Sequence, residues 1–165
     1  MSRHIDDLTA SNVYLDTMIL YAHLRMRTNA VASLFQRIED GMLQAFTASL
    51  TFDELAYRLL LGLIRDKYGS APLDRLRQQQ TAMIAEFYAL IEPQLVALQN
   101  FPNFMIAPVT SADIVVMHRN IIQFQLLPRD ALHLSIMQRM GCTNLISQDK
   151  GFDTVTDLER FVFES

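Results

Sequence analysis

LPRDALHLSIMQRMGCTNLISQDKGFD, residues 127–153, predicts a helix followed directly by a buried strand. Pro128 suits the first turn of a helix, and Gly141 suits its end. The run TNLISQD that comes next is apolar almost throughout, which is typical of a parallel strand covered on both faces. This order of elements favours an α/β fold.

The rest of the chain continues the alternation of strands and helices. Short β-type runs are expected at residues 12–16, 43–49 and 104–110, and the tail at 157–165 is expected to add a last edge strand. Helical spacing of apolar residues covers 17–27, 29–40, 49–69, 72–100, 111–125 and 128–141. We therefore predict a single domain over residues 1–165. It is a three-layer α/β/α sandwich with a mainly parallel central sheet and a longer helical segment around residues 70–100.

Local signals suggest how these helices begin and break. Ser49 or Thr51 is expected to cap the third helix, and Ser111 the helix that follows residue 110. Pro72 suits the first turn of the long segment. Pro93 is expected to kink or split it, because proline lacks the backbone N–H that a helix interior uses.

The composition limits the class of protein. Half of the 165 residues are hydrophobic and 19% are charged, which is typical of a globular chain. No uninterrupted apolar run reaches the roughly 18 residues of a membrane span, and the start MSRHIDDLTASN lacks the apolar core of a signal peptide. The single cysteine, Cys142, excludes an intrachain disulfide and a thiolate-rich zinc site. We therefore expect a cytoplasmic protein with no membrane association.

The net charge of -4 argues against binding nucleic acid by bulk charge alone, but not against a nucleic-acid enzyme.

Two acids follow predicted strands directly. Asp16 ends the first β-type run and precedes a helix, and Asp149 closes the late strand. Ligands of open parallel sheets bind beyond the carboxyl ends of the strands, so both acids would lie at that edge. Each also has a simpler interpretation. Asp16 could be a helix N-cap, worth ~1 kcal/mol, and Asp149 could bond its own backbone toward Gly151 in a turn.

Three further acids leave the same choice open. Asp130 lies in the first turn of its helix, where the helix dipole favours an acid. Glu54 could be a capping-box partner of Thr51, three residues earlier, and the adjacent Asp53 leaves the helix acid ambiguous by one position. Asp153 could cap the segment that follows it. As a set, carboxylates with little histidine or cysteine nearby suit Mg²⁺ or Mn²⁺ rather than zinc. Such a cation removes the repulsion between the acids and can activate a water for phosphoryl transfer.

Four motifs resemble the PIN-domain nucleases, and the closest pattern is that of VapC-type toxins. They are YLDT, the acid in the helix after the second strand, PRDALHLSIM and LISQDKGFD. The resemblance implies that four acids hold one or two Mg²⁺ or Mn²⁺ ions, with Asp153 as a further acid near the metals and with Thr17 and Ser147 as hydroxyl residues that support the ligands. The four are Asp16, Glu54, Asp130 and Asp149.

The same resemblance implies an endoribonuclease that acts on RNA as the toxin of a toxin–antitoxin pair. It also implies an antitoxin protein as partner and a homodimer, for which the apolar stripes at residues 28–40 and 51–64 are candidate surfaces. Arg129 and Lys150 are candidates for RNA backbone contacts, and His133 is interpreted as a helix-packing residue or as a support for the ligands.

Two other classes remain as alternatives. A non-catalytic PIN-like module would bind RNA or protein without cleaving it. An aspartyl-phosphate enzyme would be phosphorylated at Asp16, but phosphatases of that type need a second acid two residues later, where this chain has Met18.

Overall fold

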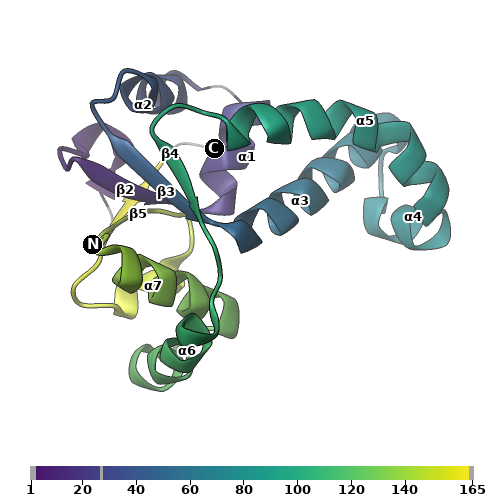
Figure 1. The fold of residues 1–165 in the computed structure, drawn as a ribbon. Helices are drawn as coiled ribbons and strands as arrows, with labels where there is room; N and C mark the ends of the chain where they lie inside the picture. Colours follow the sequence, from purple (N-terminus) through teal and green to yellow (C-terminus); the bar gives the residue numbers. More distant parts are fainter. Residues whose placement is uncertain (1–2, 27, 164–165) are drawn as a thin grey trace.

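A computed structural model describes residues 3–26 and 28–163 of the chain. Its centre is a six-stranded, wholly parallel sheet in the order β1-β6-β5-β2-β3-β4 (Figure 1). The strands are β1 (Arg3–His4), β2 (Asn12–Leu15), β3 (Gln44–Ala48), β4 (Phe104–Ala107), β5 (Asn144–Ile146) and β6 (Glu159–Val162).

Seven α-helices are described, and they cover both faces of the sheet. They are α1 (Thr17–Arg25), α2 (Asn29–Glu39), α3 (Ser49–Tyr68), α4 (Pro72–Gln78), α5 (Gln80–Gln99), α6 (Ser111–Phe124) and α7 (Pro128–Met140). In Figure 1, α1 and α2 lie above the sheet and α6 and α7 lie below it. The predicted three-layer α/β/α sandwich is confirmed.

The central strand β2 shows why a covered strand is apolar throughout. Val13 and Leu15 point into the core beneath α1 and α2, whereas Tyr14 points into the second core beneath α7. All three are fully buried. Successive side chains of a strand face opposite sides of the sheet, so a strand with helices on both sides has no solvent-facing position.

The edge of the sheet differs from the prediction. The C-terminal strand β6 is not an edge strand, because it lies between β5 and β1. The edge is formed by β1, a two-residue strand in a polar segment with no β-type pattern. A strand this short takes its structure from the neighbour that it pairs with, and sequence periodicity therefore does not detect it.

Two helices begin at other residues than expected. The N-cap of α3 is Ala48, which makes no side-chain cap, and Ser49 is the first helical residue. Thr51 is buried instead, with its hydroxyl 3.0 Å from that of Thr47. The N-cap of α6 is Thr110 rather than Ser111, and Asp113 completes a capping box with it. Thr110 wins this position because Asp113 lies three residues after it, the spacing that reciprocal capping requires.

The predicted split at Pro93 is wrong, since α5 runs through that residue without interruption, whereas the predicted kink stays a prediction. The chain breaks earlier, at Gln79, where α4 ends and α5 begins. Pro93 leaves the carbonyl of Ala89 without a helical donor, but both residues lie on the exposed side of the helix, where water can satisfy that carbonyl.

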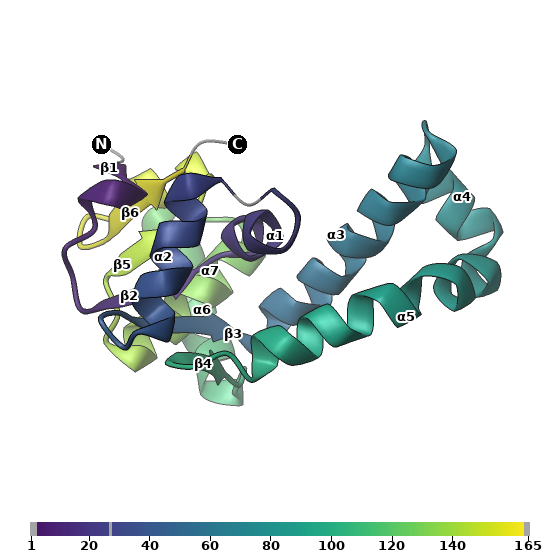
Figure 2. The same ribbon diagram turned by 90° about the horizontal axis from the view of Figure 1, so that it is seen from above.

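The helices α3, α4 and α5 extend to one side of the sandwich as a projecting arm, which Figure 2 shows from above. The arm contacts α1 closely where Gly62 lies against Tyr21. A Cβ at Gly62 would stand only 2.8 Å from the Tyr21 hydroxyl, so this close contact requires glycine. Among the described helices, α5 is long and apolar enough to cross a membrane, judged by its length and composition alone. It nevertheless contains Glu86 and Glu92 and packs one apolar face along α3.

The two apolar stripes that were candidate partner surfaces are part of the core. Val31, Leu34 and Ile38 of α2 are buried in the same cluster as Leu55 and Leu59 of α3. Their periodicity reflects packing within the chain, as an apolar helix face most often does.

Candidate active site

Four of the predicted site acids line one cavity of about 150 Å³ at the carboxyl edge of the sheet. Asp16 follows β2 and Asp149 follows the neighbouring strand β5, so the parallel topology places them at the same edge. Glu54 comes from the second turn of α3 and Asp130 from the first turn of α7. The lining is completed by Thr17, Met18, Arg58, Arg129, His133 and Gln148.

Asp16 is held in place on both carboxylate oxygens. The backbone N–H of Thr17 donates to Oδ1 at 2.7 Å, which is the helix cap that the sequence suggested. The hydroxyl of Ser147 donates to Oδ2 at 2.5 Å, and the same Ser147 oxygen accepts the backbone N–H of Asp149 at 3.0 Å. Ser147 is fully buried. It therefore ties the ends of β2 and β5 together, so Asp16 is both a cap and a cavity residue.

Glu54 is paired with two arginines. Arg58, one turn later on α3, donates from Nε to Oε1 at 2.9 Å, and its Nη2 forms an ion pair with the same oxygen at 2.8 Å. Arg129 of α7 donates to Oε2 from Nη1 at 3.0 Å. Burial alone would raise the pKa of Glu54, but the Arg58 hydrogen bond and charge, with smaller contributions from Thr17 and Arg129, lower it below the ordinary value. The Thr17 hydroxyl is itself buried and makes no well-formed hydrogen bond within the described residues.

Asp130 shows the opposite electrostatic behaviour. Burial, followed by repulsion from Asp149, Asp16 and Glu54, raises the pKa of Asp130 to about 6, against a weaker opposing effect of Arg129. The four carboxylates therefore interact with one another across the cavity. With two arginines beside them, the described lining keeps two net negative charges when all four acids are ionised and His133 is neutral.

Asp149 lines the cavity, and its Oδ1 accepts the N–H of Gly151 at 2.7 Å, which is the turn considered from the sequence. The other two acids considered from the sequence lie outside the cavity. Asp153 is not among the residues that line the cavity, and both its oxygens bind Arg160, at 2.7 and 2.9 Å. Asp53 lines a separate surface hollow on the arm. Of the adjacent pair at 53 and 54, the structure thus brings Glu54 to the cavity.

The floor of the cavity contains a buried histidine. His133 is 2% exposed, and its Nδ1 lies 2.7 Å from the hydroxyl of Tyr14. Burial lowers the pKa of His133, and this outweighs the attraction of Asp16 and Glu54. Burial, with the charge of Asp16, strongly raises the pKa of Tyr14, so the hydroxyl keeps its proton. His133 is therefore a neutral ring, and its Nε2 has no hydrogen-bond partner within the described residues.

The donor set fits a hard divalent cation. Within residues 3–26 and 28–163 no group of three or more His, Cys, Asp or Glu side chains is already arranged to hold an ion. The oxygens available are nevertheless carboxylates, and after burial it is repulsion from Asp149, Asp16 and Glu54 that raises the pKa of Asp130. Mg²⁺ and Mn²⁺ prefer such oxygens. The residues that would hold an ion are Asp16, Glu54, Asp130 and Asp149.

Three cavity residues, Met18, Arg58 and Gln148, were not identified as site residues from the sequence. Arg58 lies four residues after Glu54, which is the spacing of a helical ion pair, so the signal was present. Gln148 lies between two predicted residues and carries no pattern of its own. Lys150, a candidate for RNA contact, is exposed and is not part of the lining.

Comparison with known proteins shows the family of this chain. The family model of the PIN domain matches residues 13–158. A comparison with curated proteins found no significant match. Among solved structures, VapBC2 from Rickettsia felis bound to a promoter DNA fragment aligns with a TM-score of 0.63 and 11% identity, over 93% of this chain and 99% of that chain.

Two other solved structures have the same fold. A toxin–antitoxin complex from Klebsiella pneumoniae has a TM-score of 0.58 and 17% identity, over 88% of this chain and 94% of that chain. The toxin VapC20 of Mycobacterium tuberculosis, described as cleaving the sarcin–ricin loop, has a TM-score of 0.53 and 13% identity, over 87% and 95%. At these identities the likeness concerns the fold.

Proposed function

The chain belongs to the PIN-domain family, and on that premise we propose that it is a metal-dependent endoribonuclease, the toxin component of a toxin–antitoxin pair. The observation that carries the proposal is the convergence of Asp16, Glu54, Asp130 and Asp149 on one cavity. These residues are up to 133 positions apart in the sequence (149 minus 16). The structural neighbours, which include a toxin–antitoxin complex and a toxin described as cleaving the sarcin–ricin loop, support the biological role.

The protein's own residues prepare the site for hydrolysis of a phosphodiester. Ser147 and the N–H of Thr17 orient Asp16, so this carboxylate needs little further ordering. At neutral pH Asp130 is mostly ionised, although its pKa is about 6. The bound Mg²⁺ or Mn²⁺ would supply a lowered pKa for the attacking water and neutralise charge on the phosphoryl group. No side chain is required as a nucleophile.

Cleavage of a labelled single-stranded RNA tests the proposal. Wild-type protein is expected to cut it with Mg²⁺ or Mn²⁺ and not with EDTA, and Asp16→Asn and Glu54→Gln are expected to lose at least 100-fold in rate. Asp53→Asn is the matched control for Glu54→Gln, because it removes one charge from the adjacent position of the same helix but lies outside the cavity. If Asp16→Asn cuts as fast as wild type, the site is wrongly assigned.

A second substitution tests whether Asp153, which is not among the residues that line the cavity, affects metal binding. The resemblance makes it a candidate near the metals, but its carboxylate is bound to Arg160. Isothermal titration with Mn²⁺ in the absence of RNA separates the two roles. Weaker binding by Asp153→Asn supports a role at the metals, and unchanged binding assigns Asp153 to the Arg160 pair alone.

Non-catalytic binding is the alternative function. It is favoured if wild-type protein binds RNA without cutting it in the presence of either metal.

The proposed partners are tested separately. Light scattering after size-exclusion chromatography measures self-association, and a strict monomer at micromolar concentration would exclude the homodimer. Loss of RNA cleavage on addition of the protein encoded by the adjacent gene would support an antitoxin.

A further inference from the structure

The carboxylate of Glu54 has both oxygens bound to arginine, and this arrangement conflicts with its role as a metal ligand. Arg58 holds Oε1 and Arg129 holds Oε2. The side chain of Glu54 is 16% exposed, so water reaches it poorly. A cation that binds these oxygens must compete with two guanidinium groups for the same lone pairs and against their positive charge.

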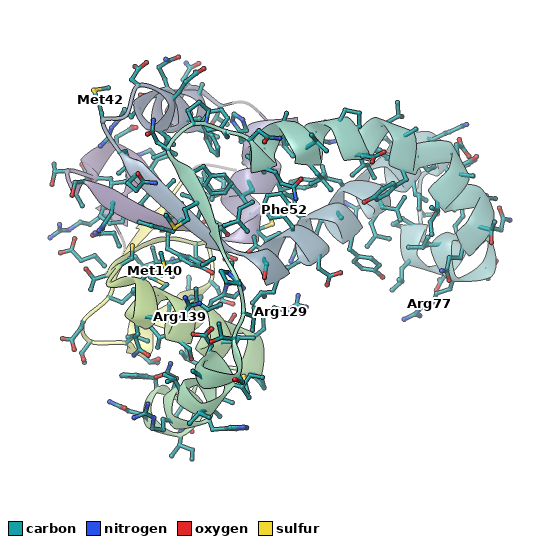
Figure 3. All side chains as sticks on the ribbon, in the orientation of Figure 1. Met42, Phe52, Arg77, Arg129, Arg139 and Met140 are labelled. Carbon is teal, nitrogen blue, oxygen red and sulfur yellow. The ribbon has the colours of Figure 1, made fainter. Side chains whose placement is uncertain are left out.

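The two arginines are placed to move. Their side chains are 46% and 54% exposed, which leaves room for other rotamers at the cavity mouth. Within the described residues, Glu54 is the only side chain to which either arginine donates a hydrogen bond. Each guanidinium has five N–H donors, and Glu54 takes no more than two from either. Figure 3 shows Arg129 below the first turns of α3, where α7 approaches the arm.

We propose that Arg58 and Arg129 form a two-position clamp, which holds Glu54 in the metal-free protein and the substrate's phosphodiester when the metal is bound. This rests on the proposed ribonuclease function. Metal binding engages Glu54 and releases the arginines beside a site where the RNA backbone arrives. Planar guanidinium groups bind phosphate oxygens through paired N–H donors, so the released side chains find a second anion of suitable geometry.

The charges of the cavity favour a movement of the arginines from Glu54 to the phosphate that is coupled to metal binding, rather than independent binding of metal and RNA. With both arginines on Glu54, the described lining has two net negative charges, which one divalent ion neutralises. A phosphodiester then brings one further negative charge. Turning the arginines does not change the total charge of the site, but it places their positive charge directly beside the phosphate. The clamp therefore makes RNA affinity depend on metal, and it keeps the empty site from binding RNA through the arginines.

A purely structural role of these arginines predicts different behaviour. Exposed ion pairs contribute little to stability. If Arg58 only paired with Glu54 within α3 and Arg129 only joined α7 to α3, their removal would lower thermal stability slightly and leave metal affinity unchanged or weaker. The clamp predicts effects of opposite sign on metal and on RNA.

The test uses Arg58→Gln, Arg129→Gln and the double variant. Mn²⁺ affinity is measured by titration calorimetry without RNA, and we expect each single variant to bind Mn²⁺ about 3–10-fold more tightly because a competing cation is gone. Affinity for a labelled single-stranded RNA is measured by anisotropy in Ca²⁺, with a gel to show that the RNA stays intact. We expect about 5–20-fold weaker binding, with a shallower salt dependence for each arginine removed. In EDTA the same variants should differ from wild type by less than about 2-fold.

Arg77→Gln is the matched control, because Arg77 is exposed on α4 at the far end of the arm, as Figure 3 shows. It should change neither affinity. Arg58→Lys and Arg129→Lys keep the charge but lose the planar fork, and they should bind Mn²⁺ like wild type and RNA more weakly.

The outcomes separate this proposal from the ribonuclease assignment. Unchanged or weaker Mn²⁺ binding in the glutamine variants overturns the clamp, as does unchanged RNA binding in Ca²⁺, while wild-type cleavage that requires Asp16 still supports the enzyme. Failure of wild-type protein both to bind Mn²⁺ and to cut RNA overturns the ribonuclease assignment instead, and the clamp with it. Circular-dichroism melting of each variant confirms that the compared proteins are folded.

Discussion

Replacing Asp130 by asparagine is expected to stabilise the metal-free protein while it abolishes RNA cleavage. Two physical effects act on this residue in opposite directions. Asp130 lies in the first turn of α7, where the helix dipole favours a carboxylate by about 0.3–1 kcal/mol. It also lies against three other carboxylates in a partly buried cavity, which disfavours the same charge.

The pKa gives the size of the unfavourable effect. Burial and the neighbouring acids raise the pKa of Asp130 from 3.8 to about 6. At 1.36 kcal/mol per pKa unit this corresponds to ~3 kcal/mol. Because Asp130 is only partly buried, solvent screening reduces this to ~1–2 kcal/mol. After the lost dipole interaction is subtracted, Asp130→Asn should stabilise the protein by ~1 kcal/mol, a rise in melting temperature of about 2–4 °C for a domain of this size.

Thermal melting in EDTA at several pH values is the assay. The folded pKa is raised, so the penalty for the charged form is complete above pH ~6 and disappears as the pH falls toward the ordinary value of 3.8. The advantage of Asp130→Asn should therefore be largest near pH 7.5 and should vanish near pH 4. Added Mg²⁺ should raise the melting temperature of wild type more than that of the variant.

A variant that melts below wild type at pH 7.5 in EDTA would refute this reasoning. It would mean that the helix dipole outweighs the burial and the repulsion that act on the carboxylate of Asp130. Asp53→Asn serves as the control, because it removes an acid from outside the cavity. It should leave the melting temperature within about 1 °C of wild type, as substitutions of exposed residues usually do.

Three further substitutions test individual contacts. The hydrogen bond from Arg139 lowers the pKa of Asp113 to about 2, and Asp113→Asn removes the charge that makes this pair. The substitution should cost ~1 kcal/mol of stability at pH 7 in urea titrations, a difference that is present above the ordinary pKa of 3.8 and is lost as the pH falls toward 2. Tyr14→Phe leaves Nδ1 of His133 buried without its partner and should cost ~1–3 kcal/mol, measured as a lower urea midpoint, whereas an unchanged midpoint would show that the contact adds nothing. Ser147→Ala frees Oδ2 of Asp16 and should weaken Mn²⁺ binding by roughly 10–100-fold in calorimetry, and affinity equal to that of wild type would exclude an orienting role.

Much of the fold followed from local patterns in the sequence. The apolar run before Asp149 and the helix from Pro128 to Gly141 have the periods of a covered strand and of an amphipathic helix, and both elements lie where predicted. Pro128 and Gly141 at the ends of α7 influence only the few residues beside them, so their effect can be predicted from the sequence alone. The parallel order of the sheet followed from the alternation of strands with helices.

Other features depend on contacts between distant residues. The edge strand β1 exists because β6 pairs with it, and α5 continues through Pro93 because the exposed side of the helix lets water satisfy the freed carbonyl. The two stripes first considered as partner surfaces belong to the core. A periodicity of 3.6 residues predicts that a helix has an apolar face, but it does not predict which part of the protein packs on that face.

The sequence by itself determined which residue types stand at the ends of the strands, and hence that acids collect at one edge of a parallel sheet. Only the tertiary structure decided that Glu54 rather than Asp53 faces the cavity, that Asp153 is bound to Arg160, and that Arg58 and Arg129 occupy Glu54. The reason is that charge interactions depend on distance in space and on burial, and neither quantity is fixed by position along the chain.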